Sequence, residues 1–216
     1  MKRKIYHKKT GMYVDWEQIS QLPDIDNFID IGVGAGTFDL WKKYKNKKII
    51  CIDPLDKSEK IVSKKLKGKN YLFHRIALGS KTEHKYLNIE KNFGRSSLLK
   101  VTQKNYEGKP LSRLKVKIEK LDKILKKDKL KGSFGIKIDV EGYEFEVLKG
   151  AKKTLLQTKF LIIEVRHNHI SFKNQYKLHE LIDFLTKNNF ILTNIFTAKP
   201  FIADLCFQSK KFLKKK

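Results

Sequence analysis

The stretch of sequence that decides the fold is NFIDIGVGAG, residues 27–36. Its apolar start predicts a short buried strand, and its glycines predict a tight turn that leads into a helix over residues 37–44. A second apolar run at residues 48–53 predicts the next buried strand and ends on Asp53, 17 residues after Gly36. In doubly wound α/β sheets, an acid at this place accepts hydrogen bonds from the hydroxyls of a ribose. The stretch therefore predicts a parallel sheet with a nucleoside-binding loop.

The rest of the chain continues to alternate between strand and helix patterns. Further strands are expected at residues 70–77, 83–89, 134–140, 160–165, 190–196 and 203–207, with helices at 15–22, 58–66, 143–156 (interrupted at Gly150) and 176–188. Residues 93–108 resemble a loop, and residues 114–125 pass from a strand pattern into a helix pattern. This alternation predicts an α/β fold with a mostly parallel sheet and helices on both of its faces. The connection Lys199-Pro200 is too short for a parallel crossover, so the last two strands are expected to form an antiparallel hairpin.

The residue before the glycines indicates which ligand the loop would accept. Dinucleotide-binding loops usually have the spacing G-x-G-x-x-G and bring a pyrophosphate to the start of the following helix. Here Gly32, Gly34 and Gly36 have the spacing G-x-G-x-G, and Asp30 precedes them. A carboxylate at this place would repel a pyrophosphate but suits a cation such as S-adenosylmethionine, which carries a sulfonium and an ammonium group. The arrangement resembles motif I of the class I methyltransferases, with Asp53 as the acid that binds the ribose.

A second motif, IKIDVEGYEFEVLKGA, occupies residues 136–151. In an extended strand, Lys137, Asp139 and Glu141 point to one face. A parallel strand is normally buried on both faces, so these charges must pair or face a cleft at the carboxyl end of the strand, where ligands bind in such sheets. A purely structural interpretation stays open, in which the two acids cap the next helix and pair with Lys137.

The second motif resembles the K-x-D-x-E-G-x-E-x-x-V/L-x-G-A signature of the FkbM family of methyltransferases. Shorter matches, in the order of that family, lie at residues 76–79, 96–98, 121–122 and 161–165. The resemblance implies a Rossmann-like class I methyltransferase fold and the use of S-adenosylmethionine as cofactor. It also implies that Ala77, in the first of the shorter matches, lies at the cofactor.

Three residues are candidates for a general base. The resemblance implies an acceptor hydroxyl on a sugar, a glycan or a natural product, whose proton must leave during methyl transfer. The strand pattern places Asp139 and Glu141 for this role, and His167 follows the neighbouring strand, where it could open onto the same cleft. His167 could equally lie in a surface loop, and Glu164 could be the partner that keeps Lys137 charged. No metal site is predicted, because the histidine segment lacks the spacing of zinc ligands. A divalent cation at Asp139 and Glu141 stays open as an alternative that the sequence does not demand.

The net charge of +25 comes from 48 Lys and Arg against 23 Asp and Glu. Such a field attracts polyanions, so the alternative interpretation is an RNA methyltransferase or an RNA-binding Rossmann-like protein. Almost all of the positive charge is lysine, whereas base reading and bidentate phosphate binding favour arginine. The sequence also contains no N-P-P-Y-like tetrapeptide and no aromatic–basic repeat. We therefore expect no specific nucleic-acid partner, and only a weak association with anionic surfaces.

The length of 216 residues fits one domain. We expect a basic arm and short helix over residues 1–26, a catalytic domain over residues 27–209 and a basic tail over residues 210–216. No apolar run is long enough for a membrane span, and the basic N-terminus lacks the apolar region of a secretory signal. Two cysteines, Cys51 and Cys206, exclude a disulfide framework and indicate a reducing cytoplasm. These patterns leave the oligomeric state open.

Overall fold

The computed structural model describes residues 5–6, 13–14, 16–102, 110–167, 171–198 and 201–213. Parts of the expected basic arm, of the loop at 93–108 and of the basic tail lie outside the described residues, as does the Lys199-Pro200 connection. Among the described residues, no helix is both long enough and apolar enough to cross a lipid bilayer.

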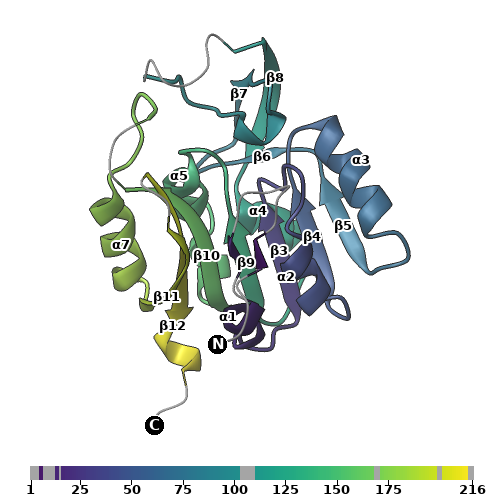
Figure 1. The fold of residues 1–216 in the computed structure, drawn as a ribbon, viewed down its shortest axis with the longest axis vertical. Helices are drawn as coiled ribbons and strands as arrows, with labels where there is room; N and C mark the ends of the chain where they lie inside the picture. Colours follow the sequence, from purple (N-terminus) through teal and green to yellow (C-terminus); the bar gives the residue numbers. More distant parts are fainter. Residues whose placement is uncertain are drawn as a thin grey trace.

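A seven-stranded sheet forms the centre of the molecule, in the order β11-β12-β10-β9-β3-β4-β5 (Figure 1). Its strands are β3 (Asn27–Ile31), β4 (Lys48–Ile52), β5 (Tyr71–His74), β9 (Phe134–Ile138), β10 (Thr158–Arg166), β11 (Phe190–Ala198) and β12 (Ile202–Ser209). The neighbours from β10 to β5 pair in parallel. The β12 strand pairs antiparallel with both β10 and β11. The expected fold class and the C-terminal antiparallel hairpin are therefore confirmed.

Helices cover both faces of this sheet. They are α1 (Trp16–Ser20), α2 (Phe38–Lys43), α3 (Asp56–Lys65), α4 (Leu121–Lys127), α5 (Glu144–Lys149), α6 (Lys152–Leu155) and α7 (Leu178–Lys187). Buried side chains of α1–α3 cluster with Phe28 of β3, whereas those of α4–α7 cluster with Ile29. Successive strand residues point to opposite faces, so each face of β3 has its own core. This two-sided burial explains why the apolar residues of β3 (Phe28, Ile29 and Ile31) face both sides of the sheet instead of one side only.

A second sheet lies above the central one in Figure 1 and was not expected. It has the order β6-β8-β7, from β6 (Ala77–Leu78), β7 (Glu83–Ile89) and β8 (Ser112–Glu119). The expected strand over residues 70–77 is therefore wrong at its end. The chain leaves the central sheet after His74, where the N–H of Ile76 donates to the His74 carbonyl at 2.9 Å, and Ala77 pairs with Ile118 instead.

The second motif also differs from its expected form at one end. The β9 strand ends at Ile138, so Asp139 and Glu141 lie on a turn and not on the strand. The following helix is interrupted at Gly150, as expected, and divides into α5 and α6. A Cβ at Gly150 would lie 2.1 Å from the carbonyl oxygen of Gly79, so only glycine allows this approach to the chain after β6.

The remaining short elements lie outside the central sheet. They are the antiparallel pair β1 (Ile5–Tyr6) and β2 (Tyr13–Val14), and the 3-10 helices η1 (Phe93–Arg95) and η2 (Lys210–Phe212). The η1 helix lies within the expected loop after β7 and, through Phe93 and Gly94, contributes to the site described next.

Candidate functional site

The glycine loop after β3 packs directly against the turn that follows β9. The N–H of Gly32 donates to the carbonyl of Ile52 at 2.9 Å, which ties the loop to the end of β4. Gly32 has a φ of +74°, and a Cβ built on it would lie 1.8 Å from the carbonyl oxygen of Asp139. The two backbones can approach this closely only because residue 32 has no side chain.

Asp53 follows β4 and faces the same loop. Its Oδ2 accepts a hydrogen bond from the N–H of Gly34 at 3.0 Å, and its Oδ1 accepts one from the N–H of Leu55 at 2.8 Å. Burial raises the pKa of Asp53, while these two backbone donors act in the opposite direction. The carboxylate is thereby held at a fixed place beside the glycine loop, with lone pairs left for a further donor.

A cleft of about 560 Å³, part of it open solvent, lies between the glycine loop, the turn after β9 and the small sheet. Six of the nine predicted site residues line it: Gly32, Gly34, Asp53, Ala77, Asp139 and Glu141. Apolar side chains of Leu55, Leu87 and Leu98 form part of its walls. The structure therefore brings together most of the predicted residues, from four separate segments, at the carboxyl end of the parallel strands.

Three predicted residues, Asp30, Gly36 and His167, are not among those that line the cleft. Asp30 is fully buried within β3, and its Oδ2 accepts a hydrogen bond from Nε1 of Trp41 at 2.8 Å. Burial raises the pKa of Asp30. His167 is exposed after β10, where its N–H donates to the carbonyl of Phe201 at 3.2 Å.

Lys137 is a buried cation in contact with Asp139. Its Nζ lies 2.7 Å from Oδ2 of Asp139, so the direct partner of Lys137 is Asp139 and not Glu164. Burial opposes the charged ammonium, but the carboxylates of Asp139, Asp30 and Asp204 together hold the pKa of Lys137 above its usual value. The side chain is therefore charged, within a group of acids from β3, β12 and the turn.

Glu141 pairs with Arg166, not with Lys137 as the structural interpretation had it. Both side chains are only 8% exposed. Asp139, Glu141 and Glu164 each offer a carboxylate oxygen, and these oxygens lie within 4.8 Å of one another. Burial and then the neighbouring acids raise the pKa of Glu164 well above its usual value. Such a group could coordinate a divalent cation, but the ammonium and the guanidinium already supply opposite charge to it.

Sequence reasoning did not assign a role to Arg166. The signal that could have found it is strand order, because β10 lies beside β9 in parallel, with Ile163 opposite Ile138. Residues just beyond these two positions must meet at one sheet edge. The placement of Arg166 opposite Glu141 follows from that register.

The comparisons with known proteins agree with this fold. The family model described as "Methyltransferase FkbM domain" matches residues 30–192. A methyltransferase FkbM from Methylobacillus flagellatus KT has a similar fold, with a TM-score of 0.52, 15% identity, and coverage of 84% of this chain and 43% of that one. An uncharacterized protein from Listeria monocytogenes serotype 4b has a TM-score of 0.50, 13% identity, and coverage of 93% and 69%. This chain thus spans less than half the length of the Methylobacillus protein.

Among curated proteins, none matches the chain in sequence. The solved structures, at these low identities, support the fold. The family model covers more than half of the chain and includes the glycine loop, Asp53 and the second motif. On this match, the chain belongs to the FkbM family of methyltransferases.

Proposed function

We propose that the protein is an S-adenosylmethionine-dependent O-methyltransferase that acts on a hydroxyl of a sugar, a glycan or a natural product. The observation that carries the proposal is the cleft, because the glycine loop and Asp53 line the same space as Asp139 and Glu141. One part of this space suits a nucleoside, and the other offers carboxylates to a reacting hydroxyl.

The residues around the glycine loop fit such a cofactor. A Cβ at Gly34 would lie 3.5 Å from the Cα of Gly94, so a side chain there would reach into the gap between the two segments. With glycine, the loop backbone stays open to a ligand. The carboxylate of Asp53 is held by Gly34 and Leu55 in a place where it can accept hydrogen bonds from ribose hydroxyls.

S-adenosylmethionine, when bound, would supply an electrophilic methyl group. The protein then has to hold the acceptor oxygen in line with that group and take up its proton. Among the predicted bases, Asp139 is the best placed, because its side chain is 27% exposed whereas that of Glu141 is 8% exposed. We assign proton removal to a carboxylate oxygen of Asp139. The ion pair with Arg166 is assigned the role of holding the Glu141 side chain in place on the turn.

The proposal is tested in two stages. Calorimetry with S-adenosylmethionine, S-adenosylhomocysteine and NADH should give binding of the first two only. Methyl-labelled S-adenosylmethionine is then incubated with the protein and a panel of monosaccharides, glycans and polyols, and mass spectrometry looks for the added methyl mass. Tight binding of NADH without binding of S-adenosylmethionine would refute the cofactor assignment.

Replacing Asp53 with Ala is expected to weaken S-adenosylhomocysteine binding by about 1.5–3 kcal/mol, the scale of hydrogen bonds to a charged acceptor. The variant loses both the ribose contact and the carboxylate that holds Gly34 and Leu55. Titration calorimetry measures the change. Asp56→Ala is the matched control, since Asp56 is an exposed acid three residues away that does not line the cleft. Equal S-adenosylhomocysteine affinities of the Asp53 variant and the control would show that Asp53 does not contribute to cofactor binding.

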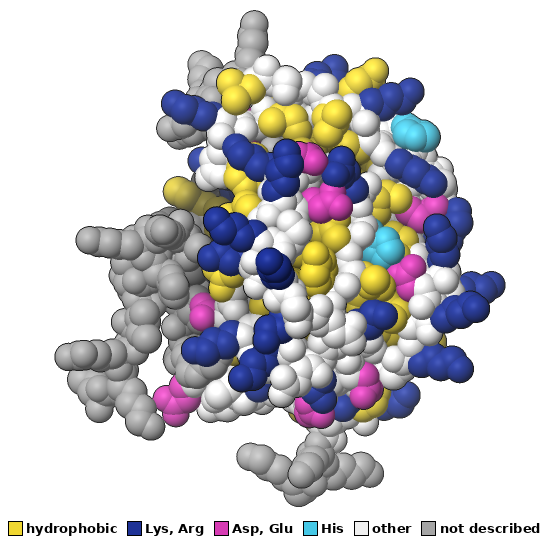
Figure 2. Space-filling model, turned by 90° about the vertical axis from the view of Figure 1, so that its right-hand side faces the viewer, with side chains coloured by type: hydrophobic (Ala, Val, Ile, Leu, Met, Phe, Trp, Pro, Cys, Tyr) yellow, Lys and Arg dark blue, Asp and Glu magenta, His cyan; other side chains and the backbone are white. Residues whose placement is uncertain are grey.

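The lysine excess is expected to give only weak, salt-sensitive binding to nucleic acids. On the face drawn in Figure 2, Lys and Arg side chains are scattered, with hydrophobic and acidic side chains between them. We therefore expect duplex DNA and RNA to bind without sequence preference and to dissociate steeply as salt rises, because counterion release dominates such binding. Fluorescence anisotropy over a salt series measures this. A sequence-specific complex that survives physiological salt would favour the RNA methyltransferase instead.

The proposed location is the cytoplasm. Both cysteines are unpaired and buried, as expected for thiols that pack as small apolar side chains in a reducing compartment.

A further inference from the structure

The turn between β9 and α5 carries both predicted acids on an irregular backbone. Glu141 has a φ of +54° and Gly142 a φ of +97°. The left-handed region is disfavoured for a residue that has a side chain, so surrounding contacts must hold Glu141 there. The turn also touches the glycine loop through the carbonyl of Asp139. A change in its shape would therefore move both acids relative to the cofactor end of the cleft.

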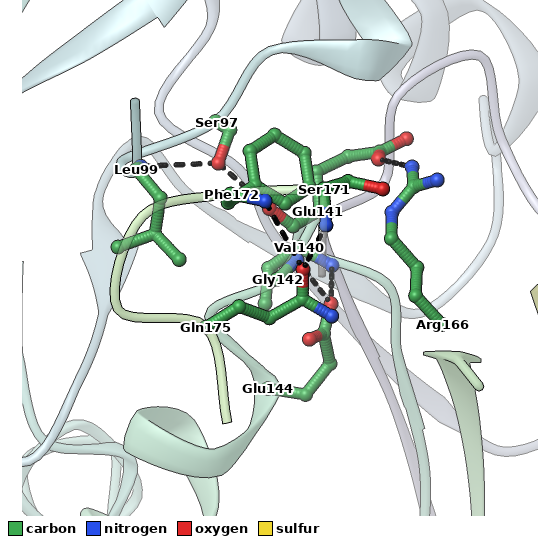
Figure 3. Close-up of polar contacts among 10 residues, drawn as sticks. All are labelled: Ser97, Leu99, Val140, Glu141, Gly142, Glu144, Arg166, Ser171, Phe172 and Gln175. Atoms are coloured by element: carbon green, nitrogen blue, oxygen red, sulfur yellow. Dashed lines mark hydrogen bonds and ion pairs between the residues drawn. The ribbon is translucent and has the colours of Figure 1, made fainter. Parts of the chain in front are cut away.

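Glu144 is the first residue of α5, and its side chain contacts this turn from below in the view of Figure 3. It is 2% exposed, and its Oε1 accepts hydrogen bonds from the N–H of Val140 at 3.1 Å and of Gly142 at 3.0 Å. N–H groups that converge in a turn of this kind form a concave site for an anion. Here the carboxylate of the same chain occupies it.

Other contacts hold the remaining side of the turn. Oγ of Ser97 donates to the carbonyl of Glu141 at 2.7 Å, and Ser97 belongs to the loop that forms one wall of the cleft (Figure 3). A Cβ at Gly142 would lie 2.8 Å from the ring of Phe172, so the turn packs tightly against that ring. Oε1 of Gln175 in turn accepts from the N–H of Phe172 at 3.3 Å. Ser97 thus donates a hydrogen bond to a carbonyl of the turn, and Glu144 accepts hydrogen bonds from two of its N–H groups.

We infer that Glu144 is a positioning residue, whose carboxylate fixes the turn over residues 139–142 so that Asp139 and Glu141 lie at the cleft. Glu144 is not among the residues that line the cleft, so it acts through the turn and not on the substrate. Its effect on methyl transfer rests on the proposed function. Its effect on the turn does not.

Two variants distinguish the effect of the acceptor oxygen of Glu144 from the effect of its side-chain volume. Glu144→Leu keeps a similar volume but has no oxygen for the N–H groups, whereas Glu144→Gln keeps one. We expect Glu144→Leu to lower kcat by about 10²-fold, the scale of a misplacement by about 1 Å at a reacting centre. Glu144→Gln should restore kcat to within about threefold of the wild type, because its amide oxygen can accept the same two hydrogen bonds. S-adenosylhomocysteine affinity should stay within about threefold in both, since the contacts of Asp53 are untouched.

Hydrogen exchange of individual amides tests the contact without any acceptor substrate. In the wild type, the amides of Val140 and Gly142 should exchange slowly, and Glu144→Leu should accelerate both by at least about tenfold, while Glu144→Gln restores the protection. Glu146→Gln is the control, because the carboxylate of Glu146 bonds Ser80 and Lys149 and not the turn.

Each outcome decides the inference. Wild-type amides of Val140 and Gly142 that exchange as fast as in an unstructured peptide would overturn it, even if Glu144→Leu does not fold. So would a folded Glu144→Leu protein with unchanged exchange or with wild-type kcat. Slow exchange in a protein that methylates no acceptor would support the role of Glu144 in the turn and refute only the proposed function.

Discussion

Turnover is expected to fall by about 10²-fold or more when Asp139 is replaced by Asn, the usual scale for the loss of an acid–base group. The substitution keeps the size of the side chain and removes its negative charge, so an acceptor hydroxyl loses the group proposed to take its proton. S-adenosylhomocysteine binding should change little, because the proposed ribose contact lies on Asp53, at the end of a different strand. The expected effect is therefore on kcat, with cofactor affinity preserved.

Steady-state kinetics with methyl-labelled S-adenosylmethionine measure this effect, and a thermal melt must accompany each assay. Asp183→Asn is the matched control, because Asp183 is an exposed acid on α7. Glu141→Gln is assayed in parallel, although it leaves the buried guanidinium of Arg166 with a weaker partner. If both folded variants turn over at the wild-type rate, the second motif has a structural role, and the group that takes the proton lies elsewhere.

Sequence reasoning predicted the strands of the central sheet that are buried on both faces. The β3, β4, β9 and β10 strands each contain a short apolar segment, and a segment of that kind between turn residues has few alternatives in an α/β chain. The glycine loop after β3 is also predictable from local sequence, because its glycines directly follow an apolar segment. Asp53 followed from its position at the end of the next strand.

The small sheet was missed because its strands depend on contacts far along the chain. Ala77 is one of only two residues in β6, and its partner Ile118 lies 41 positions later, a pairing that leaves no periodic signal. The antiparallel partner of β8, by contrast, is the alternating run at residues 83–89, which was predicted at its observed bounds.

The ion pairs of the site are likewise predictable only in part from local sequence. The sequence indicates that Lys137, Asp139 and Glu141 belong together, but their partners depend on a backbone detail. Glu141 lies on the turn with a positive φ and not on the strand, and its side chain pairs with Arg166 instead of Lys137. A positive φ at a glutamate has no sequence signal of its own, although the following Gly142 marks the turn.

Lys137 supplies the positive charge that compensates the acids around it. It lies on β9 directly opposite Asp30 of β3, and its side chain is 6% exposed. Asp139 is in direct contact with it, and Asp204 contributes from β12. Removing the cation leaves these acids inside the protein without their compensating charge, and burying an uncompensated charge is costly.

Lys137→Met is therefore expected to lower the free energy of unfolding by about 3–5 kcal/mol at neutral pH, the scale for breaking a buried ion pair from one side. Burial already raises the pKa of Asp30, and without the opposing ammonium this pKa rises further in the folded state, so stability is retained at low pH and lost as pH increases through that value. Urea unfolding at pH 5 and pH 8 should give the larger deficit at pH 8. Lys126→Met removes the same charge from an exposed position on α4 and should change stability little at either pH. An equal deficit at both pH values would mean that lost packing, and not the uncompensated acids, destabilises the variant.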